Sequence, residues 1–147
     1  MKILVLNGPN LNLLGEREPE IYGALTLSEL NKNLEEYVQT RYPDLELSFF
    51  QSNSEGALID ALQEARLNCD GVVFNPAAYT HYSYALLDAI AAISIPVVEV
   101  HLSDIDTRED FRRVSVVRPA CIAHFQGKGL QSYTDAIQCL IGSITRT

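Results

Sequence analysis

Short apolar runs alternate along the chain with longer segments in which apolar residues recur every three or four positions. The short runs lie at 2–6, 46–51, 71–75, 97–101 and, more weakly, 120–125. They read as continuous apolar stretches rather than strict alternations, which is typical of parallel strands covered by helices on both faces. The pattern therefore predicts five parallel strands.

The intervening segments predict amphipathic helices. The segment 26–42 begins with Thr26 and Glu29 at the spacing of a capping box and places Leu27, Leu30, Leu34 and Val38 on one face. A second helix is expected over 54–67 with Ser54 as its N-cap, and further helices over 81–93 and 130–144. Helices of this kind bury one face against a sheet.

Strand and helix alternate with short connections over the whole chain, and no repeat or linker interrupts them. This order predicts an α/β fold, a flavodoxin-like three-layer sandwich with a five-stranded parallel sheet. A length of 147 residues fits one domain, so we expect a single catalytic domain over 1–147. Ligands of such sheets bind beyond the carboxyl ends of the strands.

Composition and charge exclude several classes of partner. The net charge of −8 argues against nucleic acid and against an acidic membrane surface, both of which need a basic footprint. No apolar run approaches the roughly 20 residues that span a bilayer. The apolar run at the N-terminus is too short for a signal peptide, so a cytoplasmic protein is expected.

Polar side chains gather after the predicted strands. Asn7, Asn10 and Asn12 follow the first strand, and Gln51, Ser52 and Asn53 follow the second. Later segments add three cations and two histidines, namely Arg17, Arg108, Arg112, His81 and His101. Without a carboxylate cluster or a His/Cys ligand pattern, this set indicates a pocket for a small oxygen-rich anion rather than a metal site.

The fourth strand ends with the most specific pair. In an extended chain Glu99 and His101 project to the same side, so the carboxylate can orient the imidazole and raise its basicity. A purely structural pair fits the same spacing. His81 is equally consistent with a cap histidine bonded to local backbone, and Arg108 and Arg112 with the solvated face of a short helix. Asp88, in an apolar helix, is expected to be paired or at an interface.

The segment 7–23, "NGPNLNLLGEREPEIYG", is unusually long for a loop after a first strand. Loops of this length in compact domains usually bind ligands or act as lids, although an unused loop remains an alternative. Gly15 and Gly23 bracket "EREPEIY" and are candidate hinges. Arg17 and Tyr22 lie between them, and a guanidinium favours the phenolate of a nearby tyrosine. They are a candidate base and its activator.

Five motifs in this order resemble the type II 3-dehydroquinate dehydratases: "NGPNLNLLGEREPEIYG", "QSNSEGALIDALQEA", "NPAAYTHYSYALLDAI", "VVEVHLSDIDTREDFRRVS" and, more weakly, "GKGLQSY". The resemblance implies a hydro-lyase that converts 3-dehydroquinate to 3-dehydroshikimate, in the shikimate pathway or in quinate catabolism. It implies no cofactor and no metal. It also implies a homo-oligomer, a dodecamer built from trimers.

The resemblance assigns roles by position. Tyr22 matches the base, Arg17 its activating arginine, Asn12 the amide that holds a water at the enolate, His101 the acid and Glu99 its orienting carboxylate. The substrate-binding positions are Asn75, His81, Asp88, Arg112, the backbone N–H groups of Leu102 and Ser103, and Arg108. Asp88 is expected to reach the site of a neighbouring subunit.

Four positions depart from the usual family pattern, namely Leu87, Asp104, Ala123 and His124. They bear on subunit packing and on the geometry at strand ends more than on the chemistry.

Two other functions suit the same fold. A flavin-binding electron carrier needs a hydroxyl- and glycine-rich phosphate loop, where this chain has amides and a proline. A phosphoacceptor domain needs acidic residues where this chain has Asn7 and Asn75.

Overall fold

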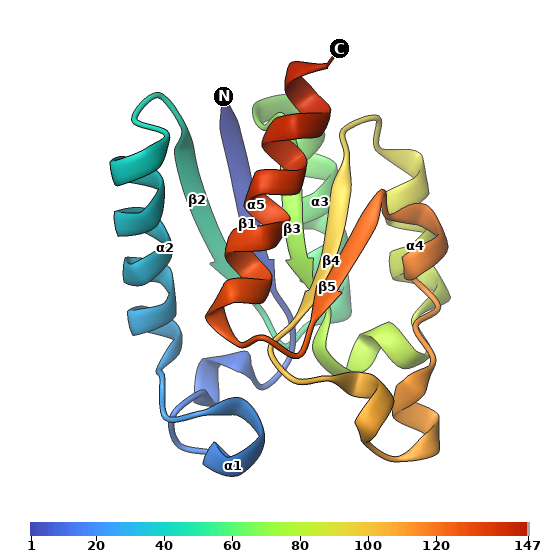
Figure 1. The fold of residues 1–147 in the computed structure, drawn as a ribbon. Coiled ribbons are helices and arrows are strands. Elements are labelled where there is room, and N and C mark those ends of the chain that lie inside the picture. The colour runs from blue at the N-terminus through green and yellow to red at the C-terminus, as the bar shows by residue number, and fades with distance from the viewer. Residues whose placement is uncertain (147) are drawn as a thin grey trace.

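The computed structural model describes residues 1–146, except for the side chain of Tyr22. Its five strands form one parallel sheet in the order β2-β1-β3-β4-β5 (Figure 1). The strands are β1 (Lys2–Asn7), β2 (Glu46–Gln51), β3 (Gly71–Asn75), β4 (Val97–His101) and β5 (Ala123–Gln126). The α/β fold and the all-parallel sheet expected from the sequence are therefore confirmed.

The described helices are α1 (Pro19–Tyr22), α2 (Leu27–Arg41), α3 (Glu55–Asn68), α4 (Tyr84–Ala92) and α5 (Leu130–Thr145). Two predicted N-caps are confirmed, since Thr26 Oγ1 accepts from the Glu29 N–H at 3.1 Å and Ser54 Oγ from the Ala57 N–H at 3.2 Å. No described helix has both the length and the apolar surface that crossing a membrane requires.

Two element boundaries differ from the sequence prediction. The segment 81–93 was expected to be one helix, but α4 begins only after Ser83, whose hydroxyl accepts the Leu86 N–H at 3.0 Å. Residues Ala77–His81 form a separate 3-10 helix, η2. The last strand begins at Ala123 rather than near 120, because Arg118–Ala120 forms another 3-10 helix, η5, which ends two residues before the strand.

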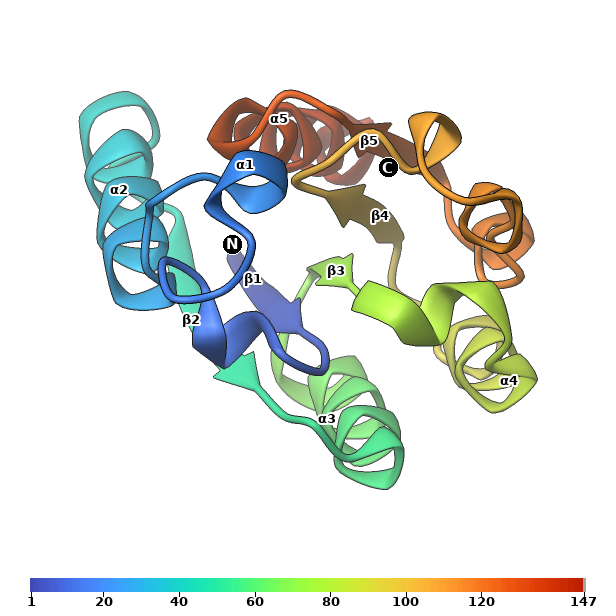
Figure 2. The same ribbon diagram turned by 90° about the horizontal axis from the view of Figure 1, so that it is seen from below.

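The helices cover the sheet in pairs, α2 and α5 on one face and α3 and α4 on the other (Figure 2). Leu30 and Leu34 of α2 and Leu58 and Leu62 of α3 are completely buried. Burying a leucine side chain contributes about 1.5–3 kcal/mol, so these two apolar layers supply most of the driving force for folding. The strands between them are fixed on both faces.

Strand order reverses at β1, which pairs with β2 on one side and with β3 on the other. At this point Asn7 and Asn75 are paired in register at the carboxyl ends of β1 and β3. Both are buried, and Tyr133 of α5 joins them: its hydroxyl donates to Asn7 Oδ1 at 2.6 Å and accepts from Asn75 Nδ2 at 2.9 Å. The point at which the strand order reverses thus holds a set of buried polar side chains joined by hydrogen bonds.

Candidate active site

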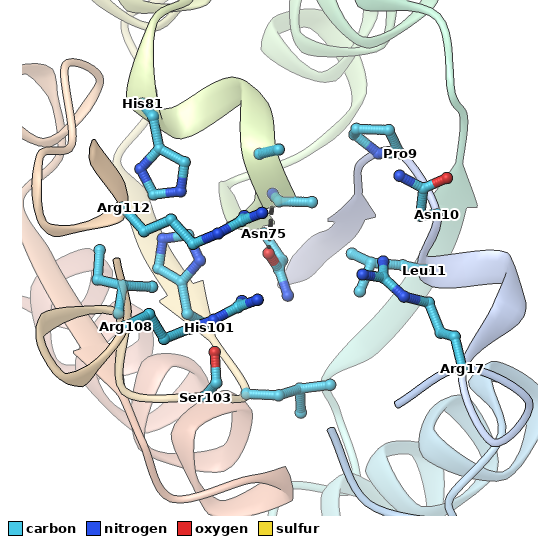
Figure 3. A pocket seen from close by; sticks show the side chains of 14 residues that line it. Pro9, Asn10, Leu11, Arg17, Asn75, His81, His101, Ser103, Arg108 and Arg112 are labelled. Atoms are coloured by element: carbon cyan, nitrogen blue, oxygen red, sulfur yellow. Dashed lines mark hydrogen bonds between the residues drawn. The ribbon is translucent and has the colours of Figure 1, made fainter. Parts of the chain in front are cut away.

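A pocket opens beyond the carboxyl ends of β1, β3 and β4 (Figure 3). This is where doubly wound sheets bind ligands. The lining residues come from the loop after β1, from β3 and η2, and from β4 and the segment after it: Pro9, Asn10, Leu11, Arg17, Asn75, Ala77, Ala78, His81, His101, Leu102, Ser103, Ile105, Arg108 and Arg112. Strands far apart in the sequence thus build one rim.

Positive charge is concentrated in this pocket although the chain is acidic overall. Arg108 and Arg112 extend into it from one side and Arg17 from the opposite side (Figure 3). None of the described lining residues carries a carboxylate. Against a net charge of −8, this local cluster makes the pocket an anion site.

The two arginines on one side of the pocket do not lie on one helix, although their spacing had suggested that they would. Arg108 follows the 3-10 helix η3 (Ile105–Thr107), whereas Arg112 belongs to the 3-10 helix η4 (Asp110–Arg113). The extended backbone of Glu109 separates the two helices, with φ −59° and ψ 152°. The Glu109 carboxylate also accepts from Arg112 Nε, which holds that guanidinium in place. The guanidiniums therefore reach the pocket from separate turns.

Glu99 and His101 pair as their spacing in the strand indicates. His101 Nε2 lies 2.7 Å from Glu99 Oε1, and the Glu99 side chain has no exposure to solvent. The hydroxyls of Thr80 and Ser115 donate to the same oxygen, each at 2.7 Å. Because Nε2 is engaged by the carboxylate, Nδ1 is the ring nitrogen of His101 that a pocket ligand would meet.

The Glu99 carboxyl has a strongly perturbed pKa. Burial alone would raise this pKa, but the hydrogen bond and charge of His101, with the hydroxyls of Thr80 and Ser115, outweigh burial and hold it well below its usual range. Glu99 is therefore a fixed negative charge behind the imidazole at all pH values near neutrality. Such a charge orients the imidazole of His101.

His81 lines the pocket, and its ring is bonded to the backbone of a distant segment rather than to local backbone. Its Nδ1 lies 2.7 Å from the carbonyl oxygen of Val114, so in the neutral ring Nδ1 carries the proton. Burial lowers the pKa of His81, and the nearby charges of His101, Arg112 and Arg108 lower it further, against a raising contribution from the Val114 carbonyl. A neutral His81 is thus held by the backbone of Val114, 33 positions away, and also lines the pocket.

Asn75 lines the pocket with its amide held from two sides. Its Nδ2 donates to the hydroxyl of Tyr133, and its Oδ1 accepts from the Ala77 N–H at 3.0 Å. Ala77 has a positive φ of 52°, which turns the chain sharply after β3. Tyr133 is completely buried, and this burial raises its pKa. The phenol therefore stays protonated and orients the asparagine.

Asn12, the expected water-holding amide, does not line the pocket. It is exposed, and its Oδ1 lies 3.5 Å from Gln51 Nε2. Asn10 lines the pocket instead, two residues earlier. Its φ of 68° is left-handed, a conformation that asparagine tolerates better than most residues, and its N–H donates to Asn53 Oδ1 at 2.9 Å. The pocket lining of this chain therefore includes Asn10 and not Asn12.

The expected lid is a loop with a glycine of positive φ at each end. Gly15 and Gly23 have φ values of 88° and 82°, which side-chain-bearing residues rarely adopt. Between them lie Arg17, which lines the pocket, and α1, closed by the Gly23 N–H bonding to the Pro19 carbonyl oxygen at 2.8 Å. The side chain of Tyr22 lies outside the described residues.

Two residues that the resemblance singled out do not line the pocket. Asp88 is exposed on α4 and is not among the residues that line the pocket of this single chain. Asp104, one of the departures from the family pattern, caps η3 by accepting from the Asp106 N–H at 3.0 Å. Its neighbours Leu102 and Ser103 do line the pocket, as expected.

The apolar wall of the pocket could not be predicted from residue types. Pro9, Leu11, Ala77, Ala78 and Ile105 line it, and none of these residue types by itself indicates a binding site. The described residues contain no group of three metal-ligating side chains. The arrangement offers an acid supported by a carboxylate, a cluster of cations for an anion, and amides for oxygen atoms.

Comparisons with known proteins agree on one family. The family model of class II dehydroquinases matches residues 1–141. The chain is 56% identical over 138 residues to the 3-dehydroquinate dehydratase of Bacillus pumilus, covering 94% of this chain and 92% of that one. The crystal structure of the type II dehydroquinase from Butyrivibrio crossotus matches with a TM-score of 0.92 and 50% identity, covering 96% of this chain and 97% of that one. The enzyme from Propionibacterium acnes matches with a TM-score of 0.90 and 40% identity, covering 96% of each chain.

Proposed function

The chain belongs to the class II dehydroquinase family, and we propose that its pocket removes water from 3-dehydroquinate through an enolate, giving 3-dehydroshikimate. The activity is that of a hydro-lyase, 3-dehydroquinate dehydratase. One observation carries the mechanism: the Glu99–His101 pair faces a pocket ringed by three arginines and lined, in its described part, by no acidic residue. The whole chain acts as one catalytic domain.

Tyr22 is the base of the proposed reaction. It takes the proton next to the ketone as a phenolate, and the electron pair of that C–H bond passes to the ketone oxygen to form the enolate. A tyrosine needs help to ionise near neutral pH, because its ordinary pKa is about 10. Arg17 lies five residues before it in the same glycine-bracketed segment and lines the pocket. Its guanidinium favours the ionised phenol.

The enolate oxygen requires a hydrogen-bond donor placed before the reaction starts. Family likeness pointed to Asn12, but Asn10 is the asparagine of this loop that lines the pocket. We therefore assign to Asn10 the role of holding a water against the enolate oxygen. The bond from its N–H to Asn53 supports the assignment, because it fixes the turn that carries the amide.

His101 is the acid. When the enolate collapses, the C–O bond to the leaving hydroxyl breaks and the proton on Nδ1 passes to that oxygen, so that water departs. The electron pair returns to form the conjugated double bond. Glu99 keeps its negative charge throughout and stabilises the imidazolium before the transfer. A positioned acid of this kind contributes about 10²–10⁴-fold in rate.

The remaining groups hold the substrate. The backbone N–H groups of Leu102 and Ser103 bind its carboxylate, at the position where the chain turns after β4. Asn75, His81 and Arg112 bind its hydroxyl groups, and Arg108 adds positive charge near the base. Amide and imidazole groups that are already held by protein bonds need little reordering to bind.

We further propose that the working form is a homo-oligomer, a dodecamer of trimers, in which Asp88 completes a neighbour's site. The exposure of Asp88 on an otherwise apolar helix supports this assignment. Three aromatic side chains, Tyr82 just before α4, Tyr84 in its first turn and Phe111 in η4, are 60–66% exposed. Large exposed aromatics are enriched where subunits meet.

The proposed activity is tested by adding 3-dehydroquinate and following the enone absorbance of the product. We expect turnover by the wild type and a loss of at least about 10²-fold in kcat in His101→Ala. Turnover should also survive borohydride in the presence of substrate, because the described pocket lining contains no lysine to form an imine. A wild type that produces no enone absorbance would overturn the proposal.

A further inference from the structure

Arg118, in the 3-10 helix η5, lies behind the acid and reaches two segments of the site at once. Its Nε donates to Glu99 Oε2 at 2.9 Å, and its Nη2 donates to Gln126 Oε1 at 3.2 Å. It does not line the pocket. Nothing in the motifs that identified the family singled it out.

The first contact completes the surroundings of Glu99. The oxygen Oε1 already accepts from His101, Thr80 and Ser115, so Arg118 is the partner of the second oxygen, Oε2. The carboxylate is fully buried, whereas the arginine side chain retains 27% exposure. Glu99 thus faces one permanent positive charge, Arg118, and one that depends on protonation, His101.

The second contact leads to the loop that follows β4. Gln126 Nε2 donates to Asp104 Oδ1 at 2.9 Å and to Asp106 Oδ2 at 3.0 Å. Gly127, next along the chain, approaches so closely that a Cβ there would lie 3.0 Å from Asp104 Cβ. These contacts fix the segment 102–107, which contributes Leu102, Ser103 and Ile105 to the pocket.

We propose that Arg118 is a positioning residue that sets the charge state of His101 through Glu99 and holds the substrate-carboxylate loop through Gln126. The inference rests on the proposed function, because it takes His101 as the acid and the 102–107 loop as the carboxylate site. It gives Asp104, a departure from the family pattern, a structural role as the acceptor at the end of this chain of contacts.

The charge effect follows from the groups that face His101. Glu99 is the negative one. The positive or ionisable ones are His81 from η2, Arg108 and Arg112 from the segment after β4, Arg17 from the loop after β1, and Arg118 across Glu99; Cys121 lies near Glu99. Removing the Arg118 charge leaves His101 as the one cationic partner of Glu99 among the described contacts, which favours the imidazolium.

An arginine suits this position better than a lysine. The guanidinium is planar and presents donors in fixed directions, so one side chain can hold Glu99 and Gln126 together. An ammonium keeps the charge but has no such fork. The two substitutions of Arg118 therefore separate the charge effect from the effect on the loop.

Four variants test the two contacts: Arg118→Met, Arg118→Lys, Gln126→Leu and the control Arg113→Met. Arg113 has a 57% exposed side chain, pairs with Asp110 and does not line the pocket, so its loss changes the net charge equally without touching the chain of contacts. Glu99 keeps its three other donors in Arg118→Met, so this variant should fold.

The protonation of His101 is measured by hydrogen–deuterium exchange at the C2 position of histidine, followed by mass spectrometry at a series of pH values. This readout suits a large assembly, and the chain has only three histidines to resolve. We expect the His101 midpoint to move up by about one pH unit in Arg118→Met. Arg118→Lys and Arg113→Met should stay close to the wild type.

Steady-state kinetics measure how well the 102–107 segment holds the substrate carboxylate. We expect KM to rise about two- to tenfold in Gln126→Leu, because the 102–107 segment loses the hydrogen bonds from Gln126 to Asp104 and Asp106, with the His101 midpoint unchanged. Arg118→Lys should show the KM effect alone, and Arg118→Met should show both effects and a shifted pH profile of kcat/KM. An unshifted His101 midpoint in Arg118→Met, or an equal shift in Arg118→Lys, overturns the charge role. An unchanged KM in Gln126→Leu overturns the loop role.

The exchange measurement needs no turnover. An inactive wild type would therefore refute the proposed function while the link between Arg118 and His101 is still decided by the midpoints. If Arg118→Met does not fold, Arg118→Gln removes the same charge with a side chain that can still hydrogen-bond, and the same midpoint shift is required of it.

Discussion

Glu99 Oε1 and His101 Nε2 are 2.7 Å apart, and the carboxylate is completely buried while the imidazole reaches the pocket. A buried carboxylate is costly unless its charge is paired and hydrogen-bonded. Here hydroxyl groups, an imidazole and a guanidinium satisfy it. The pair therefore links the stability of the fold to the chemistry of the site, and each can be measured.

The first prediction concerns stability at acidic pH. The pKa of Glu99 is held below its unfolded value of about 4.3, so the folded form carries fewer protons and unfolding takes one up. The stabilisation is complete above the unfolded pKa and is lost as pH falls through the folded pKa. Below about pH 5 the wild type should lose up to about 1.4 kcal/mol per pH unit from this group.

Glu99→Gln cannot take part in this titration. Urea unfolding at pH 7, 5, 4 and 3 should therefore give a flatter pH dependence in Glu99→Gln than in the wild type, on top of a lower stability at pH 7. Glu36→Gln, at an exposed position on α2, should leave the slope almost unchanged. Equal slopes in Glu99→Gln and wild type would show that Glu99 is not the titrating group.

The second prediction separates the two asparagines of the first loop. Asn10→Ala should lower kcat by about 10²–10³-fold, as expected for the loss of a preorganised donor at a developing oxyanion. Asn12→Ala should remain within a few-fold of the wild type, because its amide contacts Gln51 outside the pocket lining. The comparison is made from kcat with 3-dehydroquinate. The reverse order of the two effects would return the role to Asn12.

The third prediction concerns the support of Asn75. Tyr133→Phe removes the hydroxyl that joins Asn7 to Asn75 and leaves two buried amides short of a partner. We expect the free energy of unfolding to fall by about 1–3 kcal/mol and KM to rise. Thr40→Val loses a hydroxyl from an exposed position on α2 and should change stability little. A Tyr133→Phe protein as stable as wild type would refute the role of this bridge.

The fourth prediction tests whether Asp88 acts in a neighbouring subunit. Asp88→Ala and Tyr22→Phe should each be nearly inactive as pure proteins. If the groups come from different subunits, mixed oligomers obtained by coexpression contain some sites with both residues intact. Activity should then exceed the sum of the two pure variants. Coexpressed protein with no gain in activity would contradict a shared site.

Hydrophobic periodicity was sufficient to predict the sheet and most helices. Strands such as β3 and β4 are buried on both faces, so most of their residues are apolar and the strands are easy to recognise. The capped helix starts at Thr26 and Ser54 were also predictable, because one hydroxyl and one N–H three residues away are enough to form them. The 3-10 helix before α4 was missed, since its five residues are too few to show a helical periodicity.

Side-chain direction in irregular segments was much harder to predict. The turn at Asn10 depends on a left-handed residue and a bond to Asn53, 43 positions away, so periodicity gives no information about which asparagine faces the pocket. Arg118 lies 19 residues after Glu99, in a separate 3-10 helix, and contacts it only in the folded chain. Such contacts arise only when the sheet has brought distant segments together.

The central claim, that Tyr22 removes the proton that starts the elimination, is tested most directly by Tyr22→Phe. Single-turnover and steady-state formation of the enone from 3-dehydroquinate should fall by about 10²–10⁴-fold, the contribution of a positioned base. Tyr42→Phe, at the end of α2 away from the pocket lining, should keep wild-type turnover. Tyr22→Phe that forms the enone as fast as the wild type would contradict the account.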